Sequence, residues 1–212
     1  SWAVMPKLQN DNPCLYSPAV KWNVSRGSYT HMTEFFGPVL SVMRAANLEE
    51  AIEIVNQTGY GLTSGLESLD EREQAIWRDS IAAGNLYINR VTTGAIVLRQ
   101  PFGGVGKSAF GPGIKAGGPN YVAQLMTFAD RPDRATPPDN PVASPEVEVL
   151  RKALVKRRER GLDDAALPAR DNLKVLAAIA SYHERYLEEF GREHDHFKLV
   201  GQDNHRRYKP VT

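Results

Sequence analysis

A glycine-rich segment, residues 92–120, restricts the possible folds of this chain more than any other segment. Glycine loses more backbone freedom on folding than other residues, so such a density is expected where φ must be positive or a main-chain N–H must approach a ligand. A strand-like run at 86–88 precedes the segment and an apolar, helix-like run at 121–126 follows it. Loops in this position build the sites of α/β proteins, so we expect a binding loop here. Its glycines lie at positions 94, 103, 104, 106, 111, 113, 117 and 118.

The composition excludes several classes of protein. With 212 residues, 42% of them hydrophobic and 24% charged, the chain can bury the core of an ordinary soluble protein. No apolar run is as long as a membrane span, and the first residues lack a signal pattern. A net charge of +1 argues against a general polyanion binder. The one cysteine, Cys14, cannot form an internal disulfide, which suits a cytoplasmic location.

Strand and helix signals alternate over the first 128 residues. Asn47 is placed to cap a helix with apolar positions Leu48, Ala51, Ile52 and Val55. Asp70 is placed to cap a second helix over 71–84, whose inward residues we expect to be Ala75, Ile76 and Ile81. Strands are predicted at 38–43, which we expect to be buried, and at 62–66 and 85–89. This alternation predicts βαβ crossovers and an α/β fold with a mainly parallel sheet and flanking helices.

Two further zones follow. Prolines at 132, 137, 138, 141 and 145 prevent helix and ladder hydrogen bonding over residues 129–145, so we expect an extended connector there. Residues 146–212 have helical patterns at 147–161 and 172–194 and end in a non-helical tail. The predicted organisation is therefore a first region at 1–128, a proline-rich linker at 129–145 and a helical C-terminal extension at 146–212.

Two segments have both a functional and a plain interpretation. The Glu34 carboxylate, just before an aromatic pair and a predicted strand, could accept hydrogen bonds from the neighbouring hydroxyls of a ribose. A solvated loop glutamate is the plain alternative, and Phe35 and Phe36 are core aromatics by default. Gly94 and Ala95 could offer adjacent backbone N–H groups to a carboxylate, or could form a simple turn.

Other candidate motifs are weaker. The run at 103–108 resembles a P-loop but fails the G-x-x-x-x-G-K-[ST] spacing. Nothing near Cys14 forms an activating pair, so we expect an inert thiol. His194 and His196 flank Asp195 without the spacing of a metal motif, so we predict a polar surface and no metal site. The basic run at 151–160 is diluted by glutamates and has no interleaved aromatics, which favours a solvated helix face over a nucleic-acid interface.

Taken in order, these segments resemble the C-terminal part of the catalytic domain of the aldehyde dehydrogenase superfamily. The resemblance covers about residues 22–128 and rests on E-x-F-G-P from Glu34 to Pro38, the helix beginning NLEEAIEIV, GNLYINR and QPFGGVGKSAFG. Within the superfamily, TTGAIVLRQPFGG and GPGIKAGGPNYVAQ resemble the L-glutamate γ-semialdehyde (Δ1-pyrroline-5-carboxylate) dehydrogenases. The tail LVGQDNHRRYKP is similar to the C-terminal motif of the bifunctional proline utilization A enzymes of proline catabolism, which fuse this activity to a proline dehydrogenase.

The resemblance implies roles at matching positions. Glu34 would hold the nicotinamide-ribose hydroxyls of NAD, and Phe36 would pack beside that ribose and the nicotinamide. Gly94 and Ala95 would donate backbone N–H groups to the α-carboxylate of glutamate semialdehyde. Phe102 would form an apolar wall beside its aliphatic chain. Residues 199–210 would cover the passage between the two active sites of the bifunctional enzymes, with Arg206 and Arg207 packing there.

The resemblance also implies what lies elsewhere. The family's nucleophilic cysteine lies about a hundred residues before E-x-F-G-P, so Cys14 is too close to Glu34 to be that residue. The NAD-binding domain and the general base would also lie outside these residues, so the chain alone is expected to be inactive, with no catalytic residue of its own. The expected partners are the rest of the enzyme and, in a homo-oligomer, further copies. FAD would be needed only by an upstream proline dehydrogenase domain. The full bifunctional enzyme could associate peripherally with membranes.

Two other functions compete with this one. A non-catalytic oligomerisation or interaction module would use the apolar faces of the helical extension, including Leu173, Leu176, Ile179 and Ala180. A nucleic-acid binder would act through residues 151–160 and would show salt-dependent affinity.

Overall fold

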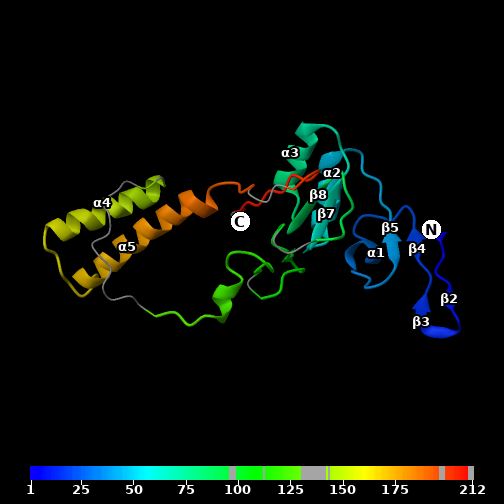
Figure 1. The fold of residues 1–212 in the computed structure, drawn as a ribbon, viewed down its shortest axis with the longest axis horizontal. Coiled ribbons are helices and arrows are strands. Elements are labelled where there is room, and N and C mark those ends of the chain that lie inside the picture. The colour runs from blue at the N-terminus through cyan, green and yellow to red at the C-terminus, as the bar shows by residue number, and fades with distance from the viewer. Residues whose placement is uncertain (96–98, 112, 130–141, 143, 196–198, 210–212) are drawn as a thin grey trace. The chain divides into compact units, whose positions relative to one another are not determined.

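The computed structural model of the protein describes residues 1–95, 99–111, 113–129, 142, 144–195 and 199–209. Two compact units divide the chain, Ser1–Gln124 and Leu125–Thr212 (Figure 1). In the residues described, the first unit combines short strands with three α-helices and a short 3-10 helix near its end, and the second is helical. No helix in these residues has both the length and the apolar character needed to cross a bilayer.

The first unit begins with a three-stranded sheet in the order β1-β4-β5. Its strands are β1 (Trp2–Val4), β4 (Ala19–Lys21) and β5 (Val39–Ser41), with β1 antiparallel and β5 parallel to β4. Between β1 and β4 a hairpin joins β2 (Leu8–Gln9) to β3 (Asn12–Tyr16). Its two loop residues, Asn10 and Asp11, both have φ of 52°, the left-handed conformation that a tight two-residue hairpin loop needs.

The predicted strand at 38–43 forms as β5, but it is not buried. Leu40 at its centre is 59% exposed. The strand lies at an edge of the sheet, where only one neighbour covers its backbone. The apolar run is therefore a partly exposed edge strand, because an apolar pattern alone does not distinguish a central strand from an edge strand.

Parallel strand pairs joined through helices give the unit its α/β character, as predicted. Along the chain, α1 (Tyr29–Met32) lies between the parallel strands β4 and β5. In the same way α3 (Glu71–Ser80) lies between the parallel strands β7 (Thr63–Leu66) and β8 (Asn85–Ile88). A further antiparallel pair joins β6 (Tyr60–Gly61) to β9 (Val105–Gly106) within the glycine-rich segment. A short 3-10 helix, Val122–Leu125, stands where the sequence predicted a helical run.

Both predicted helix caps are confirmed. The Asn47 side chain accepts a hydrogen bond from the Glu50 N–H at 2.9 Å at the start of α2 (Leu48–Gln57). The Asp70 carboxylate accepts one from the Arg72 N–H at 2.9 Å at the start of α3. Each cap satisfies a backbone donor that has no partner within its helix.

The core of this unit differs from the predicted set. Ile52, Trp77 and Ile81 are buried together, and Leu48, Leu66, Ala83, Leu86 and Ile88 pack around them. Ile76 and Val55, both expected to face inward, are exposed. Trp77 takes the inward position on α3, about 100° around the helix from Ile76. The prediction failed because both choices fit a helical period and only the docked position of α3 selects between them.

The second unit is a pair of helices, α4 (Pro145–Glu159) and α5 (Ala169–Arg185), followed by a π-helical turn, Tyr186–Phe190. Leu154, Leu176 and Ile179 form its buried core. The fully buried amide of Asn172 donates to the Leu154 carbonyl at 3.2 Å, which ties the two helices together. The helix predicted over 172–194 keeps regular α geometry only to Arg185, after which the π-helical turn begins.

The start of α4 changes the boundary of the expected connector. Pro145 was assigned to the linker, yet it is the first residue of α4 and follows the N-cap Ser144. Proline is tolerated there because the first helical N–H has no partner within the helix. Residues 130–141 and 143 of the connector lie outside the described residues.

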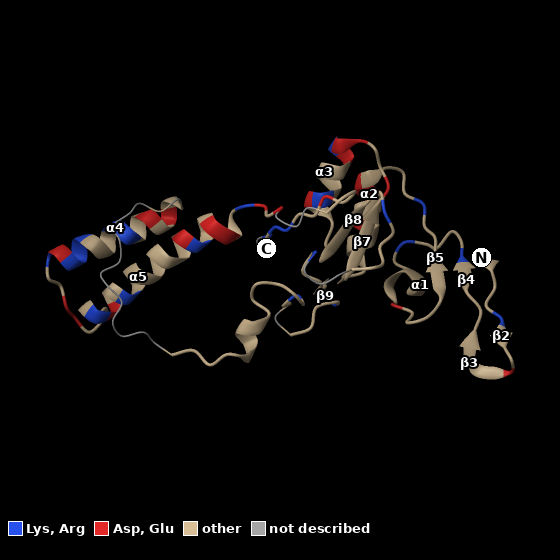
Figure 2. Cartoon of the chain, viewed as in Figure 1, with Lys and Arg blue, Asp and Glu red and all other residues tan. Residues whose placement is uncertain are grey.

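The first turn of α4 carries acidic residues, and its last turn carries mostly basic ones (Figure 2). Glu146 and Glu148 lie in the first turn and basic residues lie in the last, the arrangement that the helix dipole favours. Glu148 binds Arg151 at 2.8 Å, and this hydrogen bond is the main reason that the pKa of Glu148 falls to about 2. Part of the basic run at 151–160 is thus ion-paired within its own unit.

Candidate functional site

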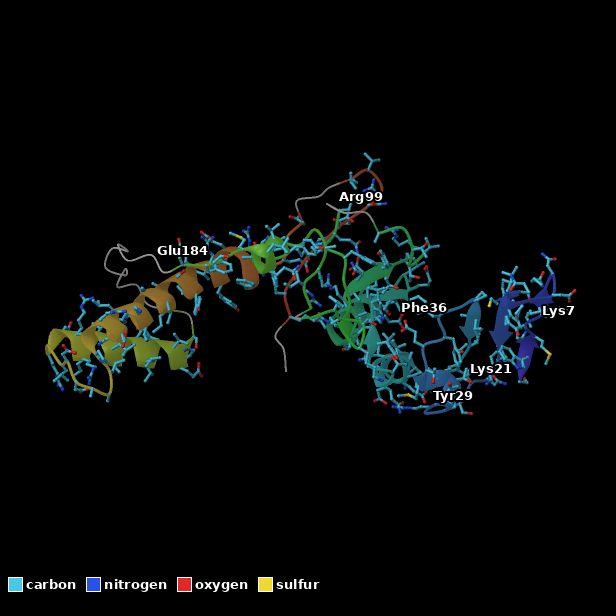
Figure 3. The ribbon with its side chains drawn as sticks, turned by 90° about the horizontal axis from the view of Figure 1, so that it is seen from below. Lys7, Lys21, Tyr29, Phe36, Arg99 and Glu184 are labelled. Carbon is cyan, nitrogen blue, oxygen red and sulfur yellow. The ribbon has the colours of Figure 1, made fainter. Side chains whose placement is uncertain are left out.

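The segment that contains Glu34 and Phe36 connects α1 to β5, and Figure 3 labels Phe36 within it. The Phe36 side chain is fully exposed. Glu34 is also exposed, and its carboxylate has no hydrogen bond or ion pair with another residue of the described chain. A bare phenyl ring and an unpartnered carboxylate on one short segment can both contact a ligand. Phe36 is therefore not the core aromatic expected by default.

The short helix before this segment is tied to α2. Ser28 caps α1 by accepting from the His31 N–H at 3.3 Å. The His31 ring accepts from the Gly27 N–H at Nδ1, 2.9 Å away, and its Nε2 lies 2.8 Å from the Ile54 carbonyl. One ring nitrogen therefore accepts and the other donates, as in a neutral imidazole. This bridge fixes where the Glu34 segment begins.

The turn at Gly94 has the conformation that glycine favours. Gly94 has φ of +79°, and both it and Ala95 are exposed. Arg90 supports the turn: its guanidinium donates to the Thr93 carbonyl at 3.1 Å and lies over the Tyr87 ring, 4.8 Å from the centroid. The turn therefore rests on the end of β8. Residues 96–98, which follow it, lie outside the described residues.

Phe102 lies where the same loop returns to the beginning of β8. It is half-buried, and its backbone exchanges two 2.9 Å hydrogen bonds with Ala116. The adjoining Gly103 N–H donates to the side chain of Asn85, the first residue of β8. The structure thus holds the Gly94 turn and Phe102 at the two ends of one strand. In the described residues, no hydrogen bond or ring contact joins this group to Glu34 or Phe36.

Sequence reasoning missed three residues that hold this loop: Asn85, Arg90 and Lys115. Asn85 is fully buried, and the Lys115 ammonium donates to the carbonyls of Gly84 and Gly103. Burial lowers the pKa of Lys115 below its usual range. A polar residue directly after a glycine at the start of a strand was the available signal for Asn85. The sequence offered no signal for Lys115, because its partners are distant in the chain.

The other candidate groups behave differently. Cys14 is exposed in β3, and nothing in the described structure prepares it for nucleophilic attack. His194 is buried, so the predicted polar surface is wrong at that position; its Nε2 lies 2.8 Å from the Glu189 carbonyl oxygen. No cluster of three or more metal-binding side chains occurs in the residues described, and His196 lies outside them.

The tail of the second unit packs against the π-helical turn that follows α5. Glu189 accepts a hydrogen bond from the Tyr208 hydroxyl at 3.0 Å and pairs with the Arg206 guanidinium at 2.8 Å. Burial, followed by the hydrogen bond and charge of Glu189, raises the pKa of Tyr208 to about 12. Arg206 therefore forms an ion pair within the second unit.

His205 gives the tail a pH-dependent contact. Its ring lies 2.7 Å from Glu193 and 3.0 Å from Asp203, and the hydrogen bond with Asp203 is the main cause of its raised pKa. A raised pKa in the folded state means that the contact stabilises the tail fully below the ordinary value of 6.5 and is lost as pH rises through the folded value.

We expect NMR titration of His205 to give a pKa above its ordinary value, and Asp203→Asn to lower that pKa, because the substitution removes the main cause of the shift. An unchanged pKa in that variant would contradict the assignment.

Comparison with known proteins identifies the family. The model of the aldehyde dehydrogenase family matches residues 4–129. The chain belongs to the aldehyde dehydrogenase family. Among curated relatives of this chain, the bifunctional protein PutA of Rhizobium meliloti is 50% identical over 101 residues, covering 47% of this chain and 8% of that protein. Succinate-semialdehyde dehydrogenase [NADP(+)] 1 of Mycobacterium tuberculosis is 44% identical over 112 residues, 53% of this chain and 24% of that protein.

One solved structure extends the likeness to the whole chain. Proline utilization A from Corynebacterium freiburgense matches with 42% identity and a TM-score of 0.80, over 100% of this chain and 20% of that one. A 1-pyrroline-5-carboxylate dehydrogenase matches with 36% identity and a TM-score of 0.51, over 57% of this chain and 23% of that one. These matches confirm the predicted resemblance. The chain spans a quarter or less of the length of these relatives.

Proposed function

We propose that this chain forms part of an NAD-dependent L-glutamate γ-semialdehyde dehydrogenase of proline catabolism, which oxidises the semialdehyde from 1-pyrroline-5-carboxylate to glutamate. The observation that carries the proposal is the likeness to proline utilization A over 100% of the chain, beyond residue 129 where the family model ends. The succinate-semialdehyde dehydrogenase match covers 53% of the chain. The helical extension therefore favours the proline enzymes.

On the cofactor side, Glu34 and Phe36 have the chemistry that NAD requires. The Glu34 carboxylate, which has no partner among the residues described, can accept hydrogen bonds from both hydroxyls of a ribose, and charged acceptors form the stronger bonds of this kind. The fully exposed Phe36 ring offers an apolar face to the sugar and nicotinamide. When bound, NAD supplies the acceptor for the hydride of the aldehyde carbon. Glu34 and Phe36 bind NAD and orient it.

On the substrate side, Gly94 and Ala95 lie in an exposed turn in which Gly94 has φ of +79°. Successive N–H groups in such a turn form a concavity that binds anions. In this proposal they hold the α-carboxylate, and Phe102 packs against the aliphatic chain. Cys14 is exposed in β3 and is not assigned as the nucleophile. Residues 1–212 therefore contribute binding surfaces, and the nucleophile, the base and the rest of the cofactor site belong to other residues of the enzyme.

Activity measurements on the complete dehydrogenase that carries this chain test the proposal. We expect NADH formation from 1-pyrroline-5-carboxylate, with lower activity on succinate semialdehyde. Glu34→Gln is expected to raise the KM for NAD about tenfold, because a hydrogen bond to a charged acceptor contributes about 1.5–3 kcal/mol. Glu67→Gln, an exposed glutamate without an ion pair in the described chain, is the matched control and is expected to leave this KM unchanged.

The isolated 212-residue chain is expected to form no NADH and to bind NAD weakly, because it would offer one edge of a cleft that needs two sides. NADH production by the purified chain would overturn this part of the proposal. Preference of the complete enzyme for succinate semialdehyde would overturn the assigned substrate.

An oligomerisation or interaction module is the second candidate, and exposed apolar side chains on the second unit favour it. Leu173, Tyr182 and Phe190 lie on α5 and the following π-helical turn and are exposed. A stable dimer of the isolated chain in sedimentation, without response to NAD or glutamate, would support this function. In the dehydrogenase proposal the same surfaces serve contacts within a cytoplasmic homo-oligomer.

A further inference from the structure

Every main-chain polar group around Phe102 is held by a named partner. The Phe102 N–H and C=O both pair with Ala116, each at 2.9 Å. The carbonyl of the preceding residue, Pro101, and both polar groups of the following one, Gly103, are held by side chains from elsewhere in the unit. Backbone groups fixed on both sides leave little freedom in the direction of the Phe102 Cα–Cβ bond.

Asn85 holds both neighbours of Phe102 at once. Its Nδ2 donates to the Pro101 carbonyl at 2.9 Å, and its Oδ1 accepts from the Gly103 N–H at 3.0 Å. The side chain is fully buried, so breaking either bond leaves a polar group unsatisfied away from water. Asn85 is the first residue of β8, which pairs in register with β7, so its two hydrogen bonds connect the loop to the sheet.

Lys115 completes the arrangement. Its ammonium donates to the Gly103 carbonyl at 3.1 Å and to the Gly84 carbonyl, so it joins the loop to the residue just before β8. A Cβ on Gly103 would lie 3.0 Å from the Lys115 Cγ and 3.1 Å from its Cα, so the loop and Lys115 are in close contact here. We refer to Asn85 and Lys115 as the Phe102 clamp.

We propose that the Phe102 clamp positions the Phe102 ring and thereby sets the affinity of the enzyme for the aliphatic chain of its aldehyde substrate. This inference rests on the proposed function, in which Phe102 contacts the substrate. Asn85 and Lys115 act through Phe102: their polar atoms are engaged with the main chain, so they hold the wall and do not bind the substrate themselves.

The test uses the complete dehydrogenase with Lys115→Met, which keeps an unbranched side chain of similar length and removes the donor. We expect the KM for glutamate semialdehyde to rise at least about tenfold, since displacement of a binding group by about 1 Å costs on the order of a hundredfold in rate. The KM for NAD is expected to stay unchanged. Lys107→Met is the matched control: Lys107 lies in the same loop and donates to the Thr58 carbonyl at 2.8 Å, away from Phe102.

A double-mutant cycle separates positioning from general loosening. If Lys115 acts through Phe102, Lys115→Met has no further effect in the Phe102→Ala enzyme, because the wall is already gone. The proposal would be overturned if Lys115→Met raised the KM for glutamate semialdehyde as much in the Phe102→Ala enzyme as in the wild type. It would also be overturned if Lys115→Met and Lys107→Met raised this KM equally. A wild-type enzyme that does not oxidise the semialdehyde would instead defeat the proposed function, so the two failures are distinguishable.

A second measurement uses the 212-residue chain and needs no catalysis. In Asn85→Ala the amide protons of Gly103, Phe102 and Ala116 are expected to exchange at least about tenfold faster in NMR hydrogen exchange, while amides in α2 stay protected. Unchanged protection at all three positions would contradict the clamp. If Asn85→Ala fails to fold, the same measurement on Lys115→Met provides the test.

Discussion

Replacing Trp77 with alanine is expected to lower the free energy of unfolding of the first unit by about 3–5 kcal/mol. Trp77 is only 3% exposed and packs against Ile52 and Ile81. Its removal leaves a cavity that rigid neighbouring elements cannot fill. The free-energy cost of this cavity adds to the lost burial of the indole ring. Because domains are stable by only about 5–15 kcal/mol, the loss is a large share of the total. Urea unfolding followed by far-ultraviolet circular dichroism measures it.

Ile76→Ala is the matched control, since Ile76 precedes Trp77 on the same helix and has the apolar character that made it the predicted core residue. Its side chain is 43% exposed, so the expected loss is below about 1 kcal/mol. A larger loss for Ile76→Ala than for Trp77→Ala would show that α3 presents its other face to the core.

The second large effect is expected for Gly84→Ala. A Cβ at this position would overlap the Gly103 carbonyl oxygen and lie 2.7 Å from the Lys115 Nζ. The obstructing atom belongs to the backbone, so a change of rotamer cannot relieve the overlap, and overpacking of this kind destabilises by about 3 kcal/mol or more. Chemical unfolding measures the loss, and NMR shifts of Gly103 and Phe102 report whether the loop has moved away from β8.

Gly37→Ala is the comparison for this substitution, because an added Cβ at Gly37 meets no atom within 4 Å. It is expected to change the free energy of unfolding by less than about 1 kcal/mol. A Gly84→Ala protein as stable as Gly37→Ala would show that the loop and β8 are not in close contact.

Local signals predicted much of the first unit correctly. The caps at Asn47 and Asp70 form as expected, because a cap involves residues two or three positions apart in the sequence. The alternation of strands and helices gave the α/β class for the same reason. The motif at 34–38 identified a segment whose carboxylate has no partner among the described residues, and the turn at Gly94 has a positive φ.

The errors share a different origin. Exposure of Leu40 follows from the edge position of β5, and the choice of Trp77 over Ile76 follows from how α3 docks. His194 is buried because the tail returns to pair with it, through mutual backbone hydrogen bonds between His194 and Arg206 at 2.8 Å. Each outcome depends on a neighbour distant in the chain, which no local period encodes.

The amino-acid order alone was enough for the family, the alternation of elements and the segments from which a site is built, since these depend on short-range spacing and on motifs that persist in related chains. Folding was needed to bring Asn85 and Lys115 to the main chain on either side of Phe102, across separations of 12 to 31 residues. The physical reason is that burial and hydrogen-bond partnership are properties of surroundings, and those surroundings exist only when distant segments meet.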